Sequence, residues 1–173
     1  MFRNVTVAAA ALLMFSTSMF AQGAKPTDPQ IAHIAYTAGT IDIQAAQQAL
    51  KMSKNKDVLA FAQNMVDDHA KVNKMALDLC KKLGVTPEDN DTSKALTKQA
   101  TDKRAALAKM SGAAFDKAYM DNEVEYHKAV NGAVEKTLIP SANNAELKSL
   151  LQTGLKIFQG HQAHAEHVAG MIK

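Results

Sequence analysis

Four long stretches of this 173-residue chain carry apolar residues at alternating intervals of three and four, the spacing that places them on one face of an α-helix. The stretches cover residues 28–53, 57–83, 113–139 and 144–173. Helix is also favoured by the abundance of Ala, Leu, Met, Lys and Gln, and no run of alternating β-branched residues beyond the N-terminal segment predicts a strand. Because one-sided helices of similar length must bury their apolar faces together, the sequence predicts an all-α four-helix bundle.

Local signals predict where these helices begin and end. Asp28 followed by Pro29 is a favourable N-cap and first helical residue for the first helix. Gly84, after two lysines, is expected to end the second helix, and Pro140 to stop the third. Capping side chains precede the second and fourth helices: Asn55 or Asp57, and Asn143 or Asn144.

Residues 85–111 separate the second and third core helices. A polar turn around Pro87 leads into a moderately amphipathic helix over residues 92–110. At ~1.5 Å per residue, this segment is about as long as the bundle and can carry the chain from one end to the other. We therefore expect a long helical crossover, as in ferritin-like bundles, and not a tight hairpin.

The first 21 residues have the layout of a secretory signal peptide. Arg3 precedes an apolar run over residues 5–20, and small residues follow at 21–24, with cleavage expected after Ala21. A membrane anchor is the alternative, but the run is short for a span of ~20 residues and is broken at Ser16, Thr17 and Ser18. The predicted organisation is thus signal peptide 1–21, flexible segment 22–27 and bundle domain 28–173. Export to the periplasm, with or without association with the outer membrane, is expected.

The remaining composition excludes several classes of partner. The 20 basic and 17 acidic side chains are interspersed, and no basic stripe with interleaved aromatic residues predicts nucleic-acid binding. No segment after the signal peptide is apolar enough to cross a bilayer. Cys80 is the single cysteine, so no intrachain disulfide forms, and its position predicts a small core residue.

Each predicted core helix carries one ionisable side chain near the middle of its apolar stripe: Asp42, His69, His127 and His161. Glu123 lies one turn before His127. Helices of similar length packed side by side bring their midpoints to one level, so these side chains should converge in the core. Buried polar groups need partners, and imidazole and carboxylate together suit Zn, Fe, Mn or Cu. The sequence therefore predicts a transition-metal site, with a hydrogen-bonded network without metal as the alternative.

Two further residues are candidates for supporting this cluster or for replacing one of its ligands. Asp68 directly precedes His69 and is a candidate to orient the His69 ring through its second nitrogen. The sequence favours the other interpretation of Asp68, a plain acidic surface pair with Asp67. His164 follows His161 by one turn and is expected at the edge of the core.

Several of these residues together resemble the bacterial domain-of-unknown-function family 4142. The resemblance rests on four elements: the run FAQNMVDDH from Phe61 to His69, Phe115-Asp116 with Tyr119, Glu123 to His127, and His161. It extends from about Ile31 to the C-terminus. The resemblance implies a ferritin-like, exported protein, often assigned to the outer membrane, whose activity is unknown. It also implies that His69, His127 and His161 are the family's characteristic histidines, with Asp42 where the family usually has Glu.

The wider ferritin-like group builds a di-metal site from Glu-x-x-His pairs. The positions three before the characteristic histidines hold other residues here: Val66, Val124 and Phe158. A standard di-iron oxidase site and iron storage in a cage are therefore disfavoured. A mononuclear site, or a relic that has lost its metal, fits the sequence better.

Three functions remain open from the sequence. The first is a metal-binding module for metal handling or envelope stress. The second is a metal-dependent redox enzyme acting on a reactive oxygen species, which needs an open coordination position that three imidazoles and one carboxylate could close. The third is a structural or interaction module of the envelope. With no phosphate-binding loop and no nucleophile motif, we expect no catalytic residue, and the sequence leans toward a role other than catalysis.

Overall fold

The computed structural model describes residues 25–172, and this part of the chain is built from helices without a strand. Four long helices form the bundle: α1 (Asp28–Met52), α2 (Lys56–Leu83), α4 (Gly112–Ala133) and α6 (Ala145–Met171). Three further elements complete it: α3 (Asp91–Leu107), the π-helix η2 (Val134–Leu138) and the short α5 (Ile139–Ser141). The predicted all-α bundle is confirmed. Among the described helices, none combines the length and the hydropathy that a bilayer span requires.

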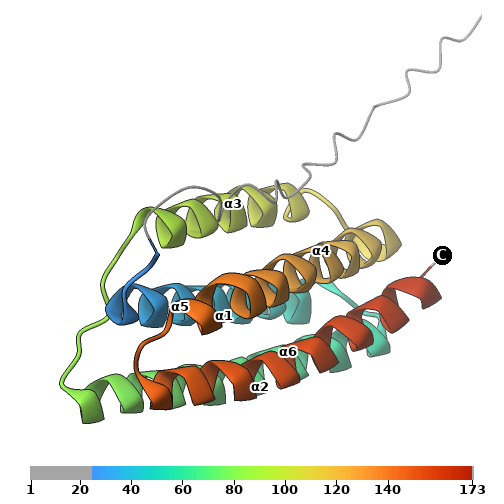
Figure 1. The fold of residues 1–173 in the computed structure, drawn as a ribbon. Helices are drawn as coiled ribbons and strands as arrows, with labels where there is room; N and C mark the ends of the chain where they lie inside the picture. Colours follow the sequence, from blue (N-terminus) through green and yellow to red (C-terminus); the bar gives the residue numbers. More distant parts are fainter. Residues whose placement is uncertain (1–24, 173) are drawn as a thin grey trace, which may run out of the picture.

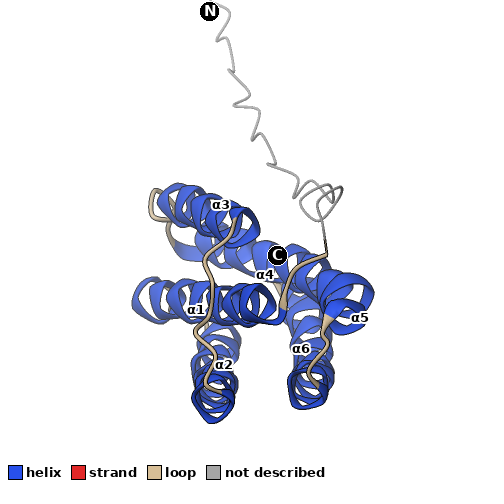
Figure 2. Ribbon diagram, turned by 60° about the vertical axis from the view of Figure 1, so that its left-hand side comes forward, coloured by secondary structure: helices blue, strands red, loops and turns tan. Residues whose placement is uncertain are grey.

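The four long helices associate as two pairs, with the crossover helix on the outside (Figure 1). Helix α1 packs most extensively on α2, and α4 on α6; contacts between α2 and α6 and between α1 and α4 join the pairs. Helix α3 connects α2 to α4 and lies mainly against α1, as the view in Figure 2 also shows. The predicted long crossover between the second and third core helices is therefore confirmed.

The start of α1 differs from the prediction by one residue. The N-cap is Thr27, whose hydroxyl accepts a hydrogen bond from the Gln30 amide while the Gln30 side chain accepts one from the Thr27 amide. The Asp28 carboxylate instead accepts hydrogen bonds from the backbone amides of Asn143 and Asn144, at 2.8 and 2.9 Å. Asp28 thus ties the start of α1 to the start of α6. The predicted signal peptide and residues 22–24 of the predicted flexible segment lie outside the described residues.

The third core helix also runs further than predicted. Pro140 was expected to stop it, but helical structure continues through η2 and α5 to Ser141. Proline has no N–H group and its ring collides with the carbonyl four residues earlier in a regular α-helix. The π-helical turn directly before Pro140 changes the hydrogen-bond register there, so the helix passes the proline and ends at Ser141.

The apolar core is divided into two clusters along the bundle. On α1, Ile31 to Ile41 belong to one cluster and Ala45 to Ala49 to the other. On α6 the two clusters hold Leu147 to Leu151 and Ala165 to Val168. Asp42 and His161 fall between them in the sequence of these helices. The core therefore has two apolar ends and a polar middle.

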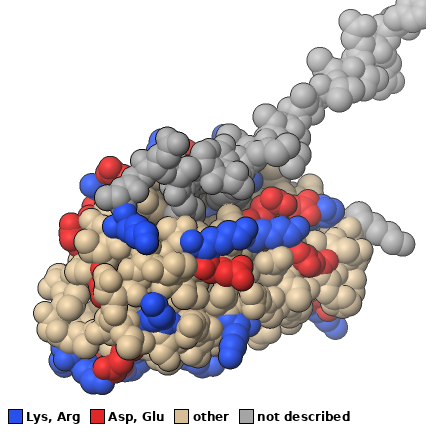
Figure 3. Space-filling view, viewed as in Figure 1, with Lys and Arg blue, Asp and Glu red and all other residues tan. Residues whose placement is uncertain are grey.

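The surface and the cysteine agree with the sequence analysis. Basic and acidic side chains are interspersed on the face shown in Figure 3. Cys80 is buried and free, as its place on the apolar face of α2 predicted.

Candidate metal centre

Five ionisable side chains meet in the polar middle of the core and form what we call the polar layer. Asp42 comes from α1, His69 from α2, Glu123 and His127 from α4, and His161 from α6. None of them is more than 7 % exposed. The structure thus brings together all five residues that the sequence predicted as metal ligands.

The three imidazoles face one another across the bundle. Their ring centroids are separated by 5.2 Å for His69 and His161, 5.7 Å for His127 and His161, and 6.0 Å for His69 and His127. One nitrogen from each ring lies within 4.8 Å of one nitrogen from each of the others. Two nitrogens bound to the same ion at ~2.1 Å can be at most ~4.2 Å apart, so side-chain movements of under ~1 Å would bring all three onto one ion.

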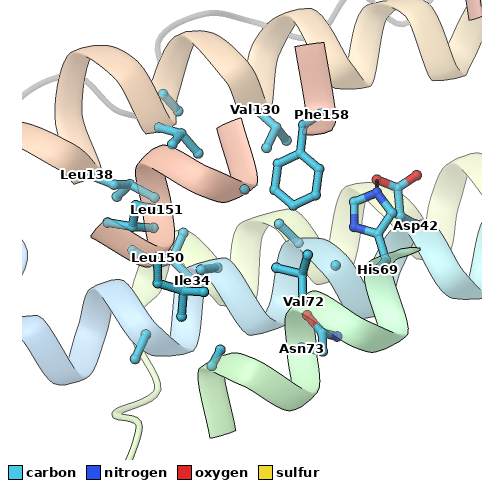
Figure 4. Close-up of a pocket in the computed structure, with 18 of the residues that line it drawn as sticks. Ile34, Asp42, His69, Val72, Asn73, Val130, Leu138, Leu150, Leu151 and Phe158 are labelled. Carbon is cyan, nitrogen blue, oxygen red and sulfur yellow. Dashed lines mark ion pairs between the residues drawn. The ribbon is translucent and has the colours of Figure 1, made fainter. Parts of the chain in front are cut away.

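Asp42 lies between two of these rings. Its Oδ2 atom is 3.2 Å from Nε2 of His69 and 3.7 Å from Nε2 of His127. Figure 4 shows the carboxylate of Asp42 facing the ring of His69. Asp42, Glu123 and His127 form a second group whose ligand atoms lie within 4.8 Å of one another. His127 belongs to both groups, and Asp42 contacts two of the three histidines. The three imidazoles and the two carboxylates therefore form one continuous cluster.

Hydrogen bonds determine which nitrogen of two of the rings points inward. Nδ1 of His127 is 3.0 Å from the backbone carbonyl of Glu123, and because a carbonyl only accepts, Nδ1–H donates and the neutral ring keeps its lone pair on Nε2. Nε2 of His161 is 3.2 Å from Oδ2 of Asp68, so Nε2–H donates to this carboxylate and Nδ1 keeps its lone pair. Histidines that bind metals commonly donate their other N–H to a carbonyl or a carboxylate in this way.

Of the two supporting candidates, His164 lies at the edge of the core as predicted, whereas Asp68 is placed differently. Asp68 neither orients His69 nor forms a plain surface pair with Asp67; its carboxylate contacts His161. Consecutive helical residues point about 100° apart, so the side chain of Asp68 reaches α6 while His69 points into the core. His164 is half-buried with its ring against Phe61, at a centroid separation of 5.3 Å, and it belongs to neither ligand group found among the described residues.

Several buried atoms of the cluster have no hydrogen-bond partner within the described chain. They are both ring nitrogens of His69, Nε2 of His127, Nδ1 of His161, Oδ1 of Asp42 and Oε2 of Glu123. His69 and Asp42 are close, but their geometry does not make a hydrogen bond. Leaving buried polar atoms without partners is costly, and most folded proteins avoid it. The side chains of this layer therefore leave several buried polar atoms to which a bound ion or water molecule could bind.

A family sequence model described as Domain of unknown function (DUF4142) matches residues 14–168. The chain belongs to this family. The resemblance drawn from the sequence motifs is thereby confirmed at the level of the family. Comparisons of this DUF4142 protein with curated proteins and with solved structures found no match.

Burial and neighbouring charges shift the pKa values of the side chains in the polar layer of this DUF4142 domain. Burial and the negative charge of Asp42 raise the pKa of Glu123 well above its usual value, and its carboxylic acid is hydrogen-bonded to Asp42. Burial acts to raise the pKa of Asp42 as well, but His69, His127 and the hydrogen bond with Glu123 lower it overall. Burial lowers the pKa of His69 from 6.5 to about 4, and also lowers the pKa of His161. At neutral pH, His69 and His161 are therefore neutral, the form that binds metal ions.

Two neighbours of the cluster were not singled out from the sequence. The ring of Phe158 is stacked on His69, with centroids 4.7 Å apart and planes inclined by 8°. Its place on the apolar stripe of the fourth helix, one turn before His161, indicated only a core residue. Asn122 is buried and its side chain hydrogen-bonds to Glu123. Asn122 directly precedes Glu123, and no spacing pattern in the sequence predicted a role for it.

Proposed function

We propose that this DUF4142 protein binds one transition-metal ion in the polar layer of its bundle. The proposed ligands are Nε2 of His69, Nε2 of His127, Nδ1 of His161 and a carboxylate oxygen of Asp42. Glu123 holds Asp42 by a hydrogen bond and offers a further oxygen when an incoming cation displaces its proton. Imidazole nitrogen and carboxylate oxygen are donors suited to Zn, Fe, Mn or Cu.

The observation that carries this proposal is the set of buried atoms without hydrogen-bond partners. If the histidines only formed a polar network, its members would be paired with one another. Instead, no hydrogen bond within the described chain reaches either nitrogen of His69, although Nε2 lies 3.2 Å from Asp42, and none reaches the inward nitrogens of His127 and His161. At the same time the outward nitrogens of His127 and His161 are both held by acceptors. Fixed outer nitrogens and unpaired inner nitrogens are the arrangement expected of a metal site.

We further propose that the protein works outside the cytoplasm, in the periplasm or at the outer membrane, in metal handling or in the response to envelope stress. The signal-peptide pattern of residues 1–21 supports this location. The N-terminal sequence of the protein recovered from its native host tests it. Cleavage after Ala21 predicts Gln22 as the first residue, and a chain that keeps Met1 contradicts export by this route.

Metal titration of untagged protein stripped with a chelator tests the metal site. Calorimetry with Zn²⁺ and elemental analysis after reconstitution should give one equivalent of ion per chain. Co²⁺ should give an absorption spectrum of low-symmetry nitrogen and oxygen coordination. If no transition metal remains bound after reconstitution, the proposal is wrong.

A matched pair of substitutions on α6 locates the ion. His161→Ala should abolish or strongly weaken binding, because it removes a buried nitrogen. His167→Ala removes the same side chain from an exposed position on the same helix and should leave the affinity unchanged. Circular dichroism of both variants controls for folding. Equal affinity of the two folded variants would place the ion elsewhere.

A further inference from the structure

An apolar cavity of about 50 Å³ lies in the core directly beside the proposed metal ligands (Figure 4). Asp42, His69 and His127 belong to its wall. Figure 4 shows Asp42 and His69 at one end of the cavity, and Leu138 and Leu151 toward the other. A void in a packed core is unusual, and this one adjoins the polar layer.

Small residues line much of the cavity. Ala35, Ala38 and Gly39 of α1 line it, together with Ala133 of α4 and Gly154 of α6. Apart from the three ligand candidates and Asn73, the residues of its wall are apolar. The cavity is thus a product of the same four helices that supply the metal ligands.

The size and lining of the cavity limit what it can hold. A single water molecule needs ~10–15 Å³ and two to four polar partners, and an apolar cavity of ~150 Å³ stays dry and takes benzene or xenon. With a volume of about 50 Å³ there is room for more than one water but not for an aromatic ring. Away from Asn73 and the ligand candidates the wall offers no hydrogen bond, so water is disfavoured there. A small apolar molecule of a few atoms satisfies both limits.

We infer that this cavity holds an apolar diatomic gas, dioxygen being the candidate, next to the metal ligands. The role of the gas at the ion rests on the proposed metal site, whereas its binding to the cavity does not. The stacked ring of Phe158 belongs to both regions, since it lines the cavity and covers one face of His69. A molecule in the cavity would therefore meet His69, His127 or Asp42 without passing through bulk water.

Nuclear magnetic resonance of the mature chain under oxygen pressure tests the inference directly, because dissolved O₂ is paramagnetic and speeds the relaxation of nearby protons. The metal-free and the Zn²⁺-loaded protein are both measured. Methyl groups of Val134 and Leu151, which line the cavity, should relax several-fold faster than those of Val58 and Val168, which are buried in the other apolar cluster and line no part of the cavity. Uniform relaxation of the four methyl sets would overturn the inference, as would water resonances in contact with the Leu151 methyls.

A pair of alanine substitutions provides the control. Ala133→Leu places a larger side chain in the cavity and should remove the excess relaxation, whereas Ala163→Leu, at an exposed position of α6, should keep it. If Ala133→Leu does not fold, Ala35→Val fills the space less severely and gives the same readout. Excess relaxation that persists in the folded filled variant contradicts the inference. Metal titration is independent of this readout, so a protein that binds Zn²⁺ but no O₂ refutes only the gas site, and the reverse result refutes only the metal site.

Discussion

Acidification should destabilise the metal-free protein through His69. Burial lowers the pKa of this residue to about 4 in the folded chain, against an ordinary value of 6.5. Because the unfolded chain takes up a proton near pH 6.5 and the folded chain does not, the contribution of His69 is fully present above pH 6.5 and is lost as the pH falls toward 4. The stability of the folded state should therefore decrease with acidity in that window and be flat above it.

The size of this effect follows from the two pKa values. Each tenfold change in proton affinity is worth ~1.4 kcal/mol, so the full difference between 6.5 and about 4 corresponds to about 3 kcal/mol. Between pH 7 and pH 5 only part of it is expressed, about 2 kcal/mol. Glu123 acts in the opposite direction: its pKa is raised, so its contribution is lost as the pH rises. Glu123 is present in both the unmodified chain and the His69→Gln variant. The difference between these two proteins therefore isolates the contribution of His69.

Urea unfolding in the presence of a chelator, followed by circular dichroism at pH 7 and pH 5, measures the effect. The free energy of unfolding of the unmodified chain should fall more than that of His69→Gln, by about 2 kcal/mol, with similar urea slopes. His167→Gln makes the same chemical change at an exposed site and should behave like the unmodified chain. If His69→Gln shows the same pH dependence as the unmodified chain, His69 is not buried as a neutral base and the reasoning is wrong.

Three further predictions concern the ion and the helix contacts. Asp68→Asn should weaken metal binding ~10–100-fold in calorimetry, because Asp68 holds His161, whereas the exposed Asp67→Asn should not; equal affinities would show that Asp68 does not support the ligand. Metal at 100 times its dissociation constant should stabilise the fold by ~2.7 kcal/mol in urea unfolding, reversibly on adding a chelator; an unchanged midpoint would contradict binding to the folded state. Gly39→Ala should lower the free energy of unfolding by ~1–3 kcal/mol in the same assay, because the new Cβ meets the Asn73 side chain, whereas Gly132→Ala, whose Cβ has no neighbouring atom within 4 Å, should be neutral or stabilising. Equal stabilities of the two variants would contradict the close contact between α1 and α2.

Much of the architecture was predictable because helix periodicity and end signals are local. Asn55, Gly84 and Asn144 act as caps where the sequence placed them. The crossover followed from the length of residues 85–111 alone. The errors came from contacts that sequence spacing does not encode: Thr27 takes the cap because it forms a reciprocal pair with Gln30. The π-helical turn before Pro140 was likewise not predicted by any local sequence signal.

The candidate site was predictable as a set of residues but not as a geometry. Helix midpoints share a level, so the convergence of Asp42 with the three histidines follows from helix lengths. The direction of a side chain between neighbouring helices does not follow from helix lengths. The contact of Asp68 with His161, and not with His69, could therefore not be predicted. No sequence pattern indicated that the inward nitrogens would make no hydrogen bond within the described chain, or that small residues would line a cavity beside them. Both properties depend on the distances between helices.

Anomalous diffraction from a crystal of the metal-loaded protein tests the central claim most directly. It should show one ion between α1, α2, α4 and α6, within ~2.0–2.2 Å of nitrogens from His69, His127 and His161 and of an oxygen of Asp42. An ion at the surface, or a polar layer whose nitrogens are joined by ordered water and hold no ion, would contradict it.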